Sequence, residues 1–416
     1  MRILIAGANY APEKTSVAPY TTGLAEHLAN QGHDVVVATS FPFYPQWRWY
    51  EPPSRWRTRQ QINGVDVWRT KIVLPPRRTA TWRVMFDSSI ALTSALTALS
   101  VPRVDVTICL SPPIQTTLVG AAVRFKLGKL VILVKDLPTE AARSVGMLKE
   151  NAALRLGIEV ERLAYKLADH VVVISGAFAS YIQRLGIDAS RITEIPDWAD
   201  LETIQPRKPD ESIRVRLGAG PEDFLVLHAG NMGAKQDLLN VVAAAVLLKM
   251  DKNVRLALIG DGTERATIAA HISALQLTNI VLLPLQPSHE FSSILAGADL
   301  LLVNQAPLIV NSVLPSKLLA YMASGRPVLA GAAAESTTAD LVQRAGCGVV
   351  VDPGRPEELA AAIRVLAREN GPSRLGAMGL RGRAYVEAHF DRDVIFRRWD
   401  ELLATLAPNR ATTPKR

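Results

Sequence analysis

The chain has 416 residues, enough for two or three domains that each bury a core of their own. With 48% hydrophobic and 21% charged residues, its composition excludes a fibrous chain and a disordered one. The net charge of +8 is modest for this length, so the distribution of the charges is more informative than their sum.

Apolar strand patterns alternate with amphipathic helix patterns from the first residues onward. This alternation predicts α/β layers with parallel sheets. In the first half, strands are expected at residues 2–6, 34–38, 65–69, 104–109, 130–134 and 170–174. Helices are expected between them, notably at residues 19–31, 83–99 and 153–168.

The alternation is interrupted at residues 195–216, where prolines and mixed charges are typical of a linker. A second series of strands is then expected at residues 224–228, 254–259, 280–283, 300–303, 327–330 and 348–351. The helices of this series are expected at residues 237–250, 264–275, 290–296 and 317–324.

We therefore predict two Rossmann-like α/β domains, residues 1–205 and 206–380, whose parallel sheets face a central cleft. A helix at residues 381–406 is expected to pack back toward the N-terminal domain, and residues 407–416 should form a flexible polar tail. In such folds ligands bind at the carboxyl ends of the strands.

The two cysteines, Cys109 and Cys347, lie far apart in apolar segments without metal-ligand spacing. This placement predicts buried thiols in a reducing compartment. The apolar start at residues 1–7 is too short for a signal peptide and suits a buried strand. The longest apolar segment, 88–101, is too short to cross a bilayer, so we expect a cytoplasmic protein without a transmembrane anchor.

Much of the positive charge falls between Trp47 and Arg83, where Arg and Lys far outnumber Asp and Glu. Tryptophans alternate with these charges, namely Trp47, Trp49, Trp56, Trp68 and Trp82. Basic residues with indoles suit an anionic membrane surface or a phosphate-bearing lipid. Nucleic acid would suit the same composition, but no nucleic-acid-binding motif accompanies it. A solvated loop region with structural tryptophans is the alternative.

Residues 310–330 have the pattern of loop, helix, turn and strand. The helix begins with Pro315, Ser316 and Lys317 and ends before Gly325. Its N-terminus offers free backbone N–H groups and the positive end of the helix dipole, so the segment suits a phosphate site. An ordinary βα unit, with Ser316 as cap and Lys317 in solvent, would show the same pattern.

Two glycine turns follow expected strands of the second half. In the first, Gly230 and Gly233 permit close approach to the backbone, and Lys235 holds a charge near the next helix. This turn suits a diphosphate, with a simple βα turn as the alternative. In the second, Gly260-Asp261-Gly262, the aspartate suits a turn and cap better than a catalyst. Neither G-x-G-x-x-G nor G-x-x-x-x-G-K-[ST] occurs, which removes the main support for a dehydrogenase or a P-loop protein.

Taken in order, these motifs resemble the donor domain of family-4 glycosyltransferases, which have the GT-B fold. The series is Gly-Asn-Met-Gly-x-Lys from residue 230, Leu-Ile-Gly-Asp-Gly from 258, Ala-Asp-Leu-Leu-Leu from 298, and Pro-Ser-Lys from 315 with Gly-Arg-Pro-Val from 325. The first half is similar to bacterial exopolysaccharide glycosyltransferases of the colanic-acid type, in residues 9–28, 31–34 and 42–47. The resemblance spans about residues 1–405.

The resemblance implies transfer of a sugar from a nucleoside-diphosphate sugar, with retained anomeric configuration and no tightly bound metal or other cofactor. Lys235 and Lys317 would stabilise the charge that develops on the diphosphate leaving group. The base would contact the loop at residues 284–286. Donor contacts are implied for a set of second-half residues, namely Gly230, Asn231, Gly233, Asp261, Leu285, Ser312, Pro315 and Ser316.

In the first half, the resemblance places the acceptor at Lys14, Thr15 and Ser16, after the first strand. Asp136 matches an acidic position near the sugar and is assigned a catalytic role. A helix cap in front of Pro138 is the alternative for Asp136.

The sequence departs from the family pattern at several points. Many family-4 enzymes carry glutamates at the positions of Ser312 and Ala320, and the second usually bonds the donor ribose. The ribose contact would then come from Tyr321 or from the loop at 311–312. The Gly-Gly common after the first strand is replaced by Ser16-Val17, and a histidine common in the N-terminal domain is not evident.

Asp391-Arg-Asp393 has the D-x-D form that metal-dependent transferases of another fold use. It stands at the start of the last helical stretch, away from any glycine turn. Capping therefore explains it better than a metal site does.

These observations predict a cytoplasmic glycosyltransferase, peripheral at the inner face of the cell membrane, that extends a lipid-linked glycan during polysaccharide biosynthesis. Its partners would be the nucleotide-sugar donor, the lipid-linked acceptor and an anionic membrane surface met through residues 47–83. Two alternatives stay open. One is an epimerase or hydrolase of nucleoside-diphosphate sugars on the same fold, and the other is a non-catalytic nucleotide-sugar-binding subunit, which the missing glutamates would suit.

Overall fold

The computed structural model describes residues 1–77, 79–137, 139, 152–307, 316–368 and 372–406. The chain forms two compact units. Unit 1 comprises Met1–Asp197 together with Ile395–Arg416, and unit 2 comprises Trp198–Val394. The expected tail at 407–416 lies outside the described residues.

Unit 1 is built on an eight-stranded sheet in the order β3-β4-β2-β1-β5-β6-β7-β8. Its strands are β1 Arg2–Ala6, β2 Asp34–Ser40, β3 Arg57–Ile62, β4 Val65–Thr70, β5 Val106–Ser111, β6 Lys129–Val134, β7 His170–Val173 and β8 Ile192–Glu194. The inner strands are aliphatic and buried, as a parallel sheet covered on both faces requires. The polar edge strand β3 pairs with β4 in antiparallel fashion.

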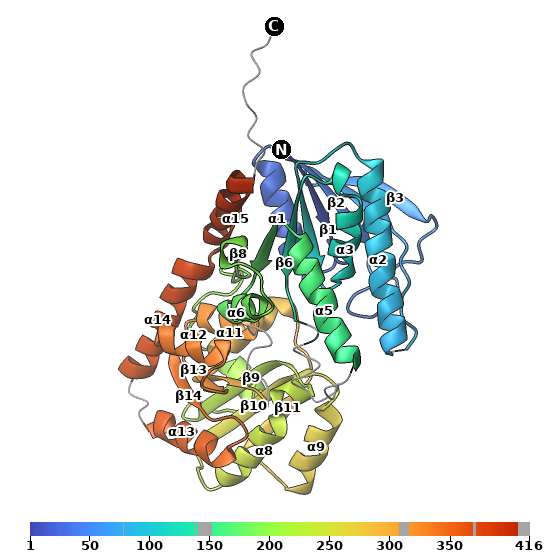
Figure 1. Cartoon of the computed structure of the whole chain (residues 1–416). Coiled ribbons are helices and arrows are strands. Elements are labelled where there is room, and N and C mark those ends of the chain that lie inside the picture. Colours follow the sequence, from blue (N-terminus) through green and yellow to red (C-terminus); the bar gives the residue numbers. More distant parts are fainter. Residues whose placement is uncertain (78, 138, 140–151, 308–315, 369–371, 407–416) are drawn as a thin grey trace. The chain divides into compact units, whose positions relative to one another are not determined.

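The helices of unit 1 cover the two faces of this sheet (Figure 1). They are α1 Ala18–Asn30, α2 Ala80–Ser100, α3 Gln115–Ala122, α5 Ala152–Leu167 and α6 Gly176–Arg184, with the short helices η1 Arg124–Lys126 and η2 Ala189–Arg191. The crossovers through α2, α3 and α5 run in one direction along the sheet, so right-handed connections place these three helices on one face. The crossover through α1 runs the opposite way and places α1 on the other face.

The last helix, α15 Arg392–Leu406, packs against α1. The imidazole of His27 stacks on the ring of Phe396 at 4.2 Å between centroids. Its Nε2 lies 3.0 Å from the carboxylate of Asp400. These contacts explain why the chain from Ile395 onward belongs to unit 1.

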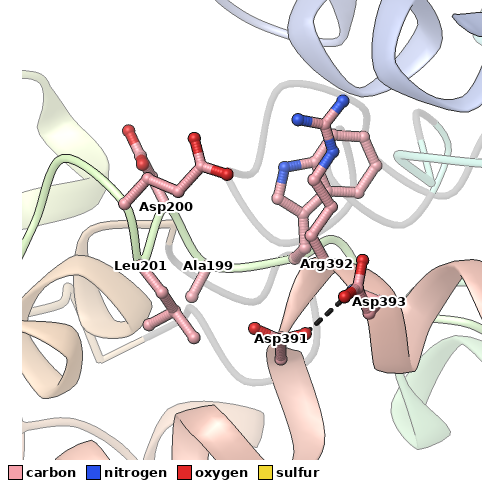
Figure 2. A pocket seen from close by; sticks show the side chains of 8 residues that line it. Ala199, Asp200, Leu201, Asp391, Arg392 and Asp393 are labelled. Carbon is pink, nitrogen blue, oxygen red and sulfur yellow. Dashed lines mark hydrogen bonds between the residues drawn. The ribbon is translucent and has the colours of Figure 1, made fainter. Parts of the chain in front are cut away.

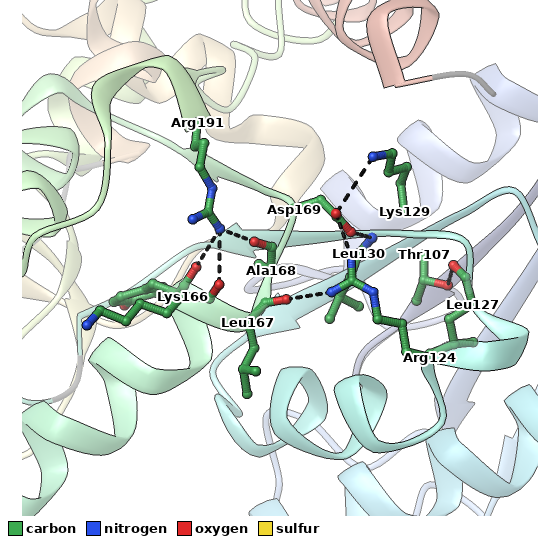
Figure 3. Close-up of polar contacts among 11 residues, drawn as sticks. Thr107, Arg124, Leu127, Lys129, Leu130, Lys166, Leu167, Ala168, Asp169 and Arg191 are labelled. Carbon is green, nitrogen blue, oxygen red and sulfur yellow. Dashed lines mark hydrogen bonds and ion pairs between the residues drawn. The ribbon is translucent and has the colours of Figure 1, made fainter. Parts of the chain in front are cut away.

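Asp169, in the turn before β7, ties the amino ends of neighbouring strands together (Figure 3). Its carboxylate accepts hydrogen bonds from the backbone N–H of Leu130 at 2.7 Å and from Arg124 at 2.5 Å. Lys129 adds a more distant ion pair at 3.8 Å. Since Arg124 opens η1, this carboxylate fixes η1 at the end of the sheet.

Unit 2 contains a six-stranded, fully parallel sheet in the order β11-β10-β9-β12-β13-β14. Its strands are β9 Phe224–Asn231, β10 Val254–Asp261, β11 Ile280–Leu283, β12 Leu300–Asn304, β13 Val328–Gly331 and β14 Gly348–Val351. Alternate residues of β9 enter different cores, because successive side chains of a strand point to opposite faces. Leu225 and Leu227 join one cluster, and Phe224 and Val226 the other.

Helices cover both faces of this sheet. They are α7 Glu211–Arg216, α8 Leu238–Leu247, α9 Arg265–Ala274, α10 Phe291–Gly297, α11 Ser316–Ala323, α12 Thr337–Ala345, α13 Pro356–Arg368 and α14 Pro372–Phe390, with the short helices η3 Ala234–Gln236 and η4 Ser288–Glu290. Both cysteines are free and buried, as expected.

The strands expected from the sequence all occur, with bounds that shift by a few residues. Two expectations are wrong. The linker at 195–216 ends in α7, whose buried Arg214 donates to Gly297 O at 2.8 Å and pairs with Asp299 at 3.0 Å. The helical stretch at 381–406 is divided at Asp391, because α14 ends and α15 begins there.

Candidate functional site

The strand order of unit 2 reverses between β9 and β12, since β10 and β11 lie on one side of β9 and the later strands on the other. Parallel α/β sheets bind ligands at the carboxyl ends of the strands beside such a reversal. Gly230 is near the carboxyl end of β9, and Gly233 and Lys235 lie in the turn that follows it. Ala306, just after β12, donates its N–H to the carbonyl of Lys235 at 2.9 Å, so the segments that follow β9 and β12 meet there.

Gly230 and Gly260 lie opposite each other at the ends of β9 and β10. A Cβ on Gly260 would lie 1.8 Å from the carbonyl oxygen of Gly230, and its φ of +148° is one that L side chains rarely adopt. A Cβ on Gly230 would meet the Lys317 ammonium at 3.2 Å. Gly230 thus leaves room for Lys317 directly against the backbone of β9, and Gly260 lets β10 approach Gly230 closely.

Lys317, in the first turn of α11, is half-buried. Desolvation lowers the pKa of its ammonium to about 8. Its Nζ lies 3.4 Å from Nε2 of His228, which is fully buried on β9. Burial and the Lys317 cation hold the pKa of His228 well below its usual range. A neutral His228 can donate from Nδ1 to Leu302 O, 3.2 Å away, and accept from Lys317 at Nε2.

Among the residues that the structure describes, Lys317 pairs with no carboxylate. Ala320 lies one turn farther along α11, on the same side as Lys317, and supplies none. Lys317 is thus a desolvated cation without a described counter-ion, near the carboxyl ends of β9 and β10. Such a cation is suited to bind an anion.

Tyr321 locks α11 to β9. Its hydroxyl accepts from the N–H of Ala229 at 2.8 Å and donates to the carbonyl of the same residue at 3.1 Å. The side chain is fully buried. The suggestion that Tyr321 contacts a ribose is therefore wrong, because its hydroxyl is already engaged and no solvent reaches it.

The second glycine turn lies beside the first. Met232 donates its N–H to the carbonyl of Asp261 at 2.8 Å, and a Cβ on Gly262 would lie 2.8 Å from the side-chain oxygen of Asn231. The carboxylate of Asp261, the last residue of β10, accepts from the N–H of Gly262 at 2.8 Å. Asn231 and Asp261 are both exposed at this edge, so they remain available to a ligand.

The other predicted donor residues are placed as follows. Leu285 is 68% exposed in the loop after β11, on the same edge of the sheet. Lys235 is half-buried in η3. Ser312 and Pro315 lie outside the described residues. Ser316 is the first residue of α11.

Lys14, Thr15 and Ser16, the predicted acceptor residues, are exposed in the loop after β1 of unit 1. The buried carboxylate of Glu13 fixes this loop, because it accepts the N–H groups of Phe43 and Tyr44, both at 2.8 Å. Ser16 has a φ of +60°, a left-handed conformation in which glycine would be unstrained.

Asp136 follows β6, at the same edge of the unit 1 sheet as the β1 loop. Its carboxylate accepts from the N–H of Leu137 at 2.9 Å. Pro138, on which the cap alternative depends, lies outside the described residues.

Asp391 and Asp393 line a small pocket in unit 2 together with Arg392 and the stretch 198–202 (Figure 2). The carboxylate of Asp391 accepts from the N–H of Asp393 at 2.9 Å. Asp391 is therefore the N-cap of α15, as predicted. No group of three or more His, Cys, Asp and Glu side chains in the described part of the chain is arranged to hold a metal ion.

The tryptophans of the basic window mostly pack inward. Trp47 lies 5.7 Å from Phe43 and 5.3 Å from Phe86 between ring centroids, in a cluster that also includes Trp49. Trp68 is covered by the guanidinium of Arg57 at 4.0 Å. Trp56 is exposed. No helix in the described ranges is long and apolar enough to span a membrane.

Three residues that position the site were missed by the sequence reasoning: His228, Asn304 and Glu13. The buried amide of Asn304 donates to the carbonyls of Gln236 and Asp237, both at 2.9 Å, and so fixes the end of the β9 turn. Two of them carry a signal that could have found them: His228 is a polar residue within an apolar strand, and Asn304 is a polar residue at the end of one.

Comparisons with known proteins agree with this geometry. Residues 15–198 match the glycosyl transferase 4-like domain, and residues 209–379 match glycosyl transferases group 1. The chain is 29% identical over 412 residues to WcaI of Escherichia coli K12, a protein named as a glycosyl transferase of colanic acid biosynthesis, with 96% of this chain and 98% of the relative covered.

Two solved structures share the fold over nearly the whole chain. Sucrose-phosphate synthase from Thermosynechococcus elongatus has a TM-score of 0.72 and 18% identity, covering 97% of this chain and 98% of the other. Anabaena HepE in complex with UDP-glucose has a TM-score of 0.68 and 17% identity, covering 97% and 100%. The chain thus belongs to the glycosyltransferases that join a 4-like domain to a group 1 domain in the GT-B fold.

Proposed function

We propose that this glycosyltransferase moves a sugar, with retention of anomeric configuration, from a nucleoside-diphosphate sugar to a lipid-linked glycan. The observation that carries the proposal is the Lys317 ammonium, half-buried against the β9 turn and paired with no described carboxylate. Such a cation can stabilise the diphosphate as it leaves, which is the main electrostatic task of this reaction.

The donor would lie along the carboxyl ends of β9, β10 and β11. Backbone N–H groups of the β9 turn and the ammonium groups of Lys235 and Lys317 would face the diphosphate. The exposed side chain of Leu285 would support the base. HepE in complex with UDP supports a nucleotide donor for a chain of this fold. We propose no tightly bound metal, since two lysines and backbone dipoles can balance the diphosphate charge.

The acceptor would lie in unit 1, near Lys14 to Ser16, with Asp136 beside the reacting sugar. Polysaccharide biosynthesis is supported by the relative named for colanic acid. A lipid-linked acceptor would hold the enzyme at the inner face of the cell membrane, as a peripheral protein. The basic residues of the 47–83 window, such as the exposed Arg48 and Arg55, would then contact lipid phosphates.

A nucleotide screen tests the donor proposal. At least one of UDP, GDP, dTDP and ADP is expected to raise the unfolding temperature, because a ligand at 100 times its Kd adds about 2.7 kcal/mol to the stability of the native state. The sugar form of the stabilising nucleotide should then be consumed only with an acceptor present. Consumption without an acceptor would point instead to a hydrolase or epimerase, and no stabilisation by any nucleotide would contradict the donor site.

Nucleotide affinity is expected to fall as the pH rises through about 8. Lys317 is a cation below its pKa of about 8 and neutral above it, so the attraction to a diphosphate is present below this pH and lost above it. An ordinary lysine would keep its charge up to about pH 10. Calorimetric titration at several pH values checks this, with Lys317→Arg as the control that stays charged. Equal affinity on both sides of pH 8 in the wild type would contradict the role of Lys317.

A further inference from the structure

The outward side of α2 carries no charge along most of its length. No charged residue occurs between Asp87 and Arg103. Leu92, Leu96 and Leu99 are nevertheless exposed, with Leu92 at 59%. Their spacing of four and three residues puts them on one side of the helix. A solvent-facing helix surface normally carries charged residues, so α2 lacks the polar surface that water would favour.

The neighbouring elements continue this apolar surface. The chain from Val106 to Val123, which includes α3, also has no charged residue. Phe125 follows in η1 and is 69% exposed. On α5, Leu156 and Leu163 are seven residues apart and both exposed. Figure 1 shows α2, α3 and α5 side by side over one face of the unit 1 sheet, with α3 in contact with both others.

We call these six exposed side chains the apolar face: Leu92, Leu96, Leu99, Phe125, Leu156 and Leu163. Single exposed hydrophobic residues are normal on protein surfaces. Several of them on adjacent elements of one layer indicate an interaction surface.

The charges beside the apolar face are mainly positive. Arg103 follows α2, and Arg155 and Lys166 lie on α5, and all three are exposed. The exposed acidic residue of the described part of α5, Glu159, is paired with Arg162 at 3.6 Å. Arg124 is held by Asp169, so η1 presents Phe125 from a fixed backbone (Figure 3).

The positive charge beside the apolar face indicates which kind of partner binds there. A second copy docked by two-fold symmetry would bring the same cations toward one another, which disfavours association. An anionic lipid surface would satisfy both features, because lipid phosphates attract Arg and Lys while leucine and phenylalanine enter the headgroup boundary.

We propose that the apolar face of α2, η1 and α5 inserts shallowly into an anionic bilayer, with Arg103, Arg155 and Lys166 on lipid phosphates. The inference rests on the proposed peripheral association with the membrane. It adds an apolar contact at a surface other than the 47–83 window, whose tryptophans mostly pack inward.

Vesicle flotation of the full chain tests the proposal. The vesicles contain phosphatidylcholine with about one third phosphatidylglycerol, which supplies the anionic surface. The variant L92E/L96E is expected to lose about tenfold or more in vesicle affinity, because two apolar side chains that would enter the bilayer become charged. The control M250E/L380E makes the same change at two exposed residues of unit 2 and should bind like the wild type. Equal unfolding temperatures show that the variants are folded.

A third variant, R48E/R55E, separates this inference from the proposed function. If R48E/R55E loses binding while L92E/L96E keeps it, the membrane contact lies in the 47–83 window and the apolar face is wrong. If the wild type binds no anionic vesicle, both membrane contacts are wrong, and the nucleotide screen still judges the donor proposal separately. Equal binding to pure phosphatidylcholine would overturn the charge argument. A dimer that L92E/L96E dissociates without loss of vesicle binding would show that a second copy occupies the face.

Discussion

Lys317→Ala is expected to lower kcat/KM for glycosyl transfer by about 10²-fold or more, the typical cost of removing one group that stabilises a developing charge. The Lys317 ammonium is desolvated beside neutral His228, and no described carboxylate neutralises its charge. A comparable loss is expected for Lys235→Ala, in the same turn region. Release of nucleoside diphosphate from the donor identified by the nucleotide screen measures the rate.

The matched control is Lys249→Ala, which removes an exposed lysine just after α8 in the same unit. It changes the net charge equally and should leave the rate unchanged. Calorimetry on the same variants tests binding as well, and nucleotide affinity should fall for Lys317→Ala but not for Lys249→Ala. Full activity of both Lys235→Ala and Lys317→Ala would refute the diphosphate assignment.

Gly260→Ala is expected to destabilise unit 2 by about 3 kcal/mol or more. The added Cβ would lie 1.8 Å from the carbonyl oxygen of Gly230, so β9 and β10 would have to separate at their carboxyl ends. The φ of +148° adds backbone strain for any L side chain. Denaturant unfolding measures the loss, and any native protein left should bind nucleotide more weakly because the β9 turn is displaced.

Gly376→Ala provides the comparison for this prediction. Gly376 lies in α14, where a Cβ would meet nothing within 4 Å. Alanine is favoured over glycine in a helix by about 1 kcal/mol, so this variant should be as stable as the wild type or more stable. A Gly260→Ala protein as stable as Gly376→Ala would show that the two strands can part without cost.

The strands and the two glycine turns could be predicted from the sequence because their signals are local. An aliphatic run such as Val254–Asp261 shows a buried strand, and a glycine pair at its end shows the turn. The order of strands then brings Gly230, Lys235 and Asp261 to one edge. Their position at one edge could be predicted for that reason, and their role in donor binding stays a prediction.

The partners of these residues could not be predicted, because their contacts join distant parts of the chain. His228 meets Lys317 across 89 residues, and Tyr321 meets Ala229 across 92. A histidine within an apolar strand does not reveal which ammonium will lie beside it. Glu13 and Phe43 are similarly joined by a bond between two loops that the sequence shows only as separate turns.

The tryptophans between residues 47 and 83 show a different limit. Composition alone could not distinguish a lipid-facing indole from a structural one. Trp47 and Trp49 pack with Phe43 and Phe86, and Trp68 lies beneath Arg57. The exposure of the α2 leucines could not be predicted either, since an apolar helix sequence does not reveal which side of the helix no other element covers.

The paired hydrogen bonds between Tyr321 and Ala229 determine at which stage the conformational entropy of positioning Lys317 is lost. Sliding α11 along β9 would break both bonds at once, so the helix that carries Lys317 has one register on the sheet. The entropy of fixing that ammonium is therefore lost during folding, before any donor arrives. Under the proposed mechanism, each catalytic cycle would then begin with the positive charge already oriented, and little reorganisation would be needed as the diphosphate departs.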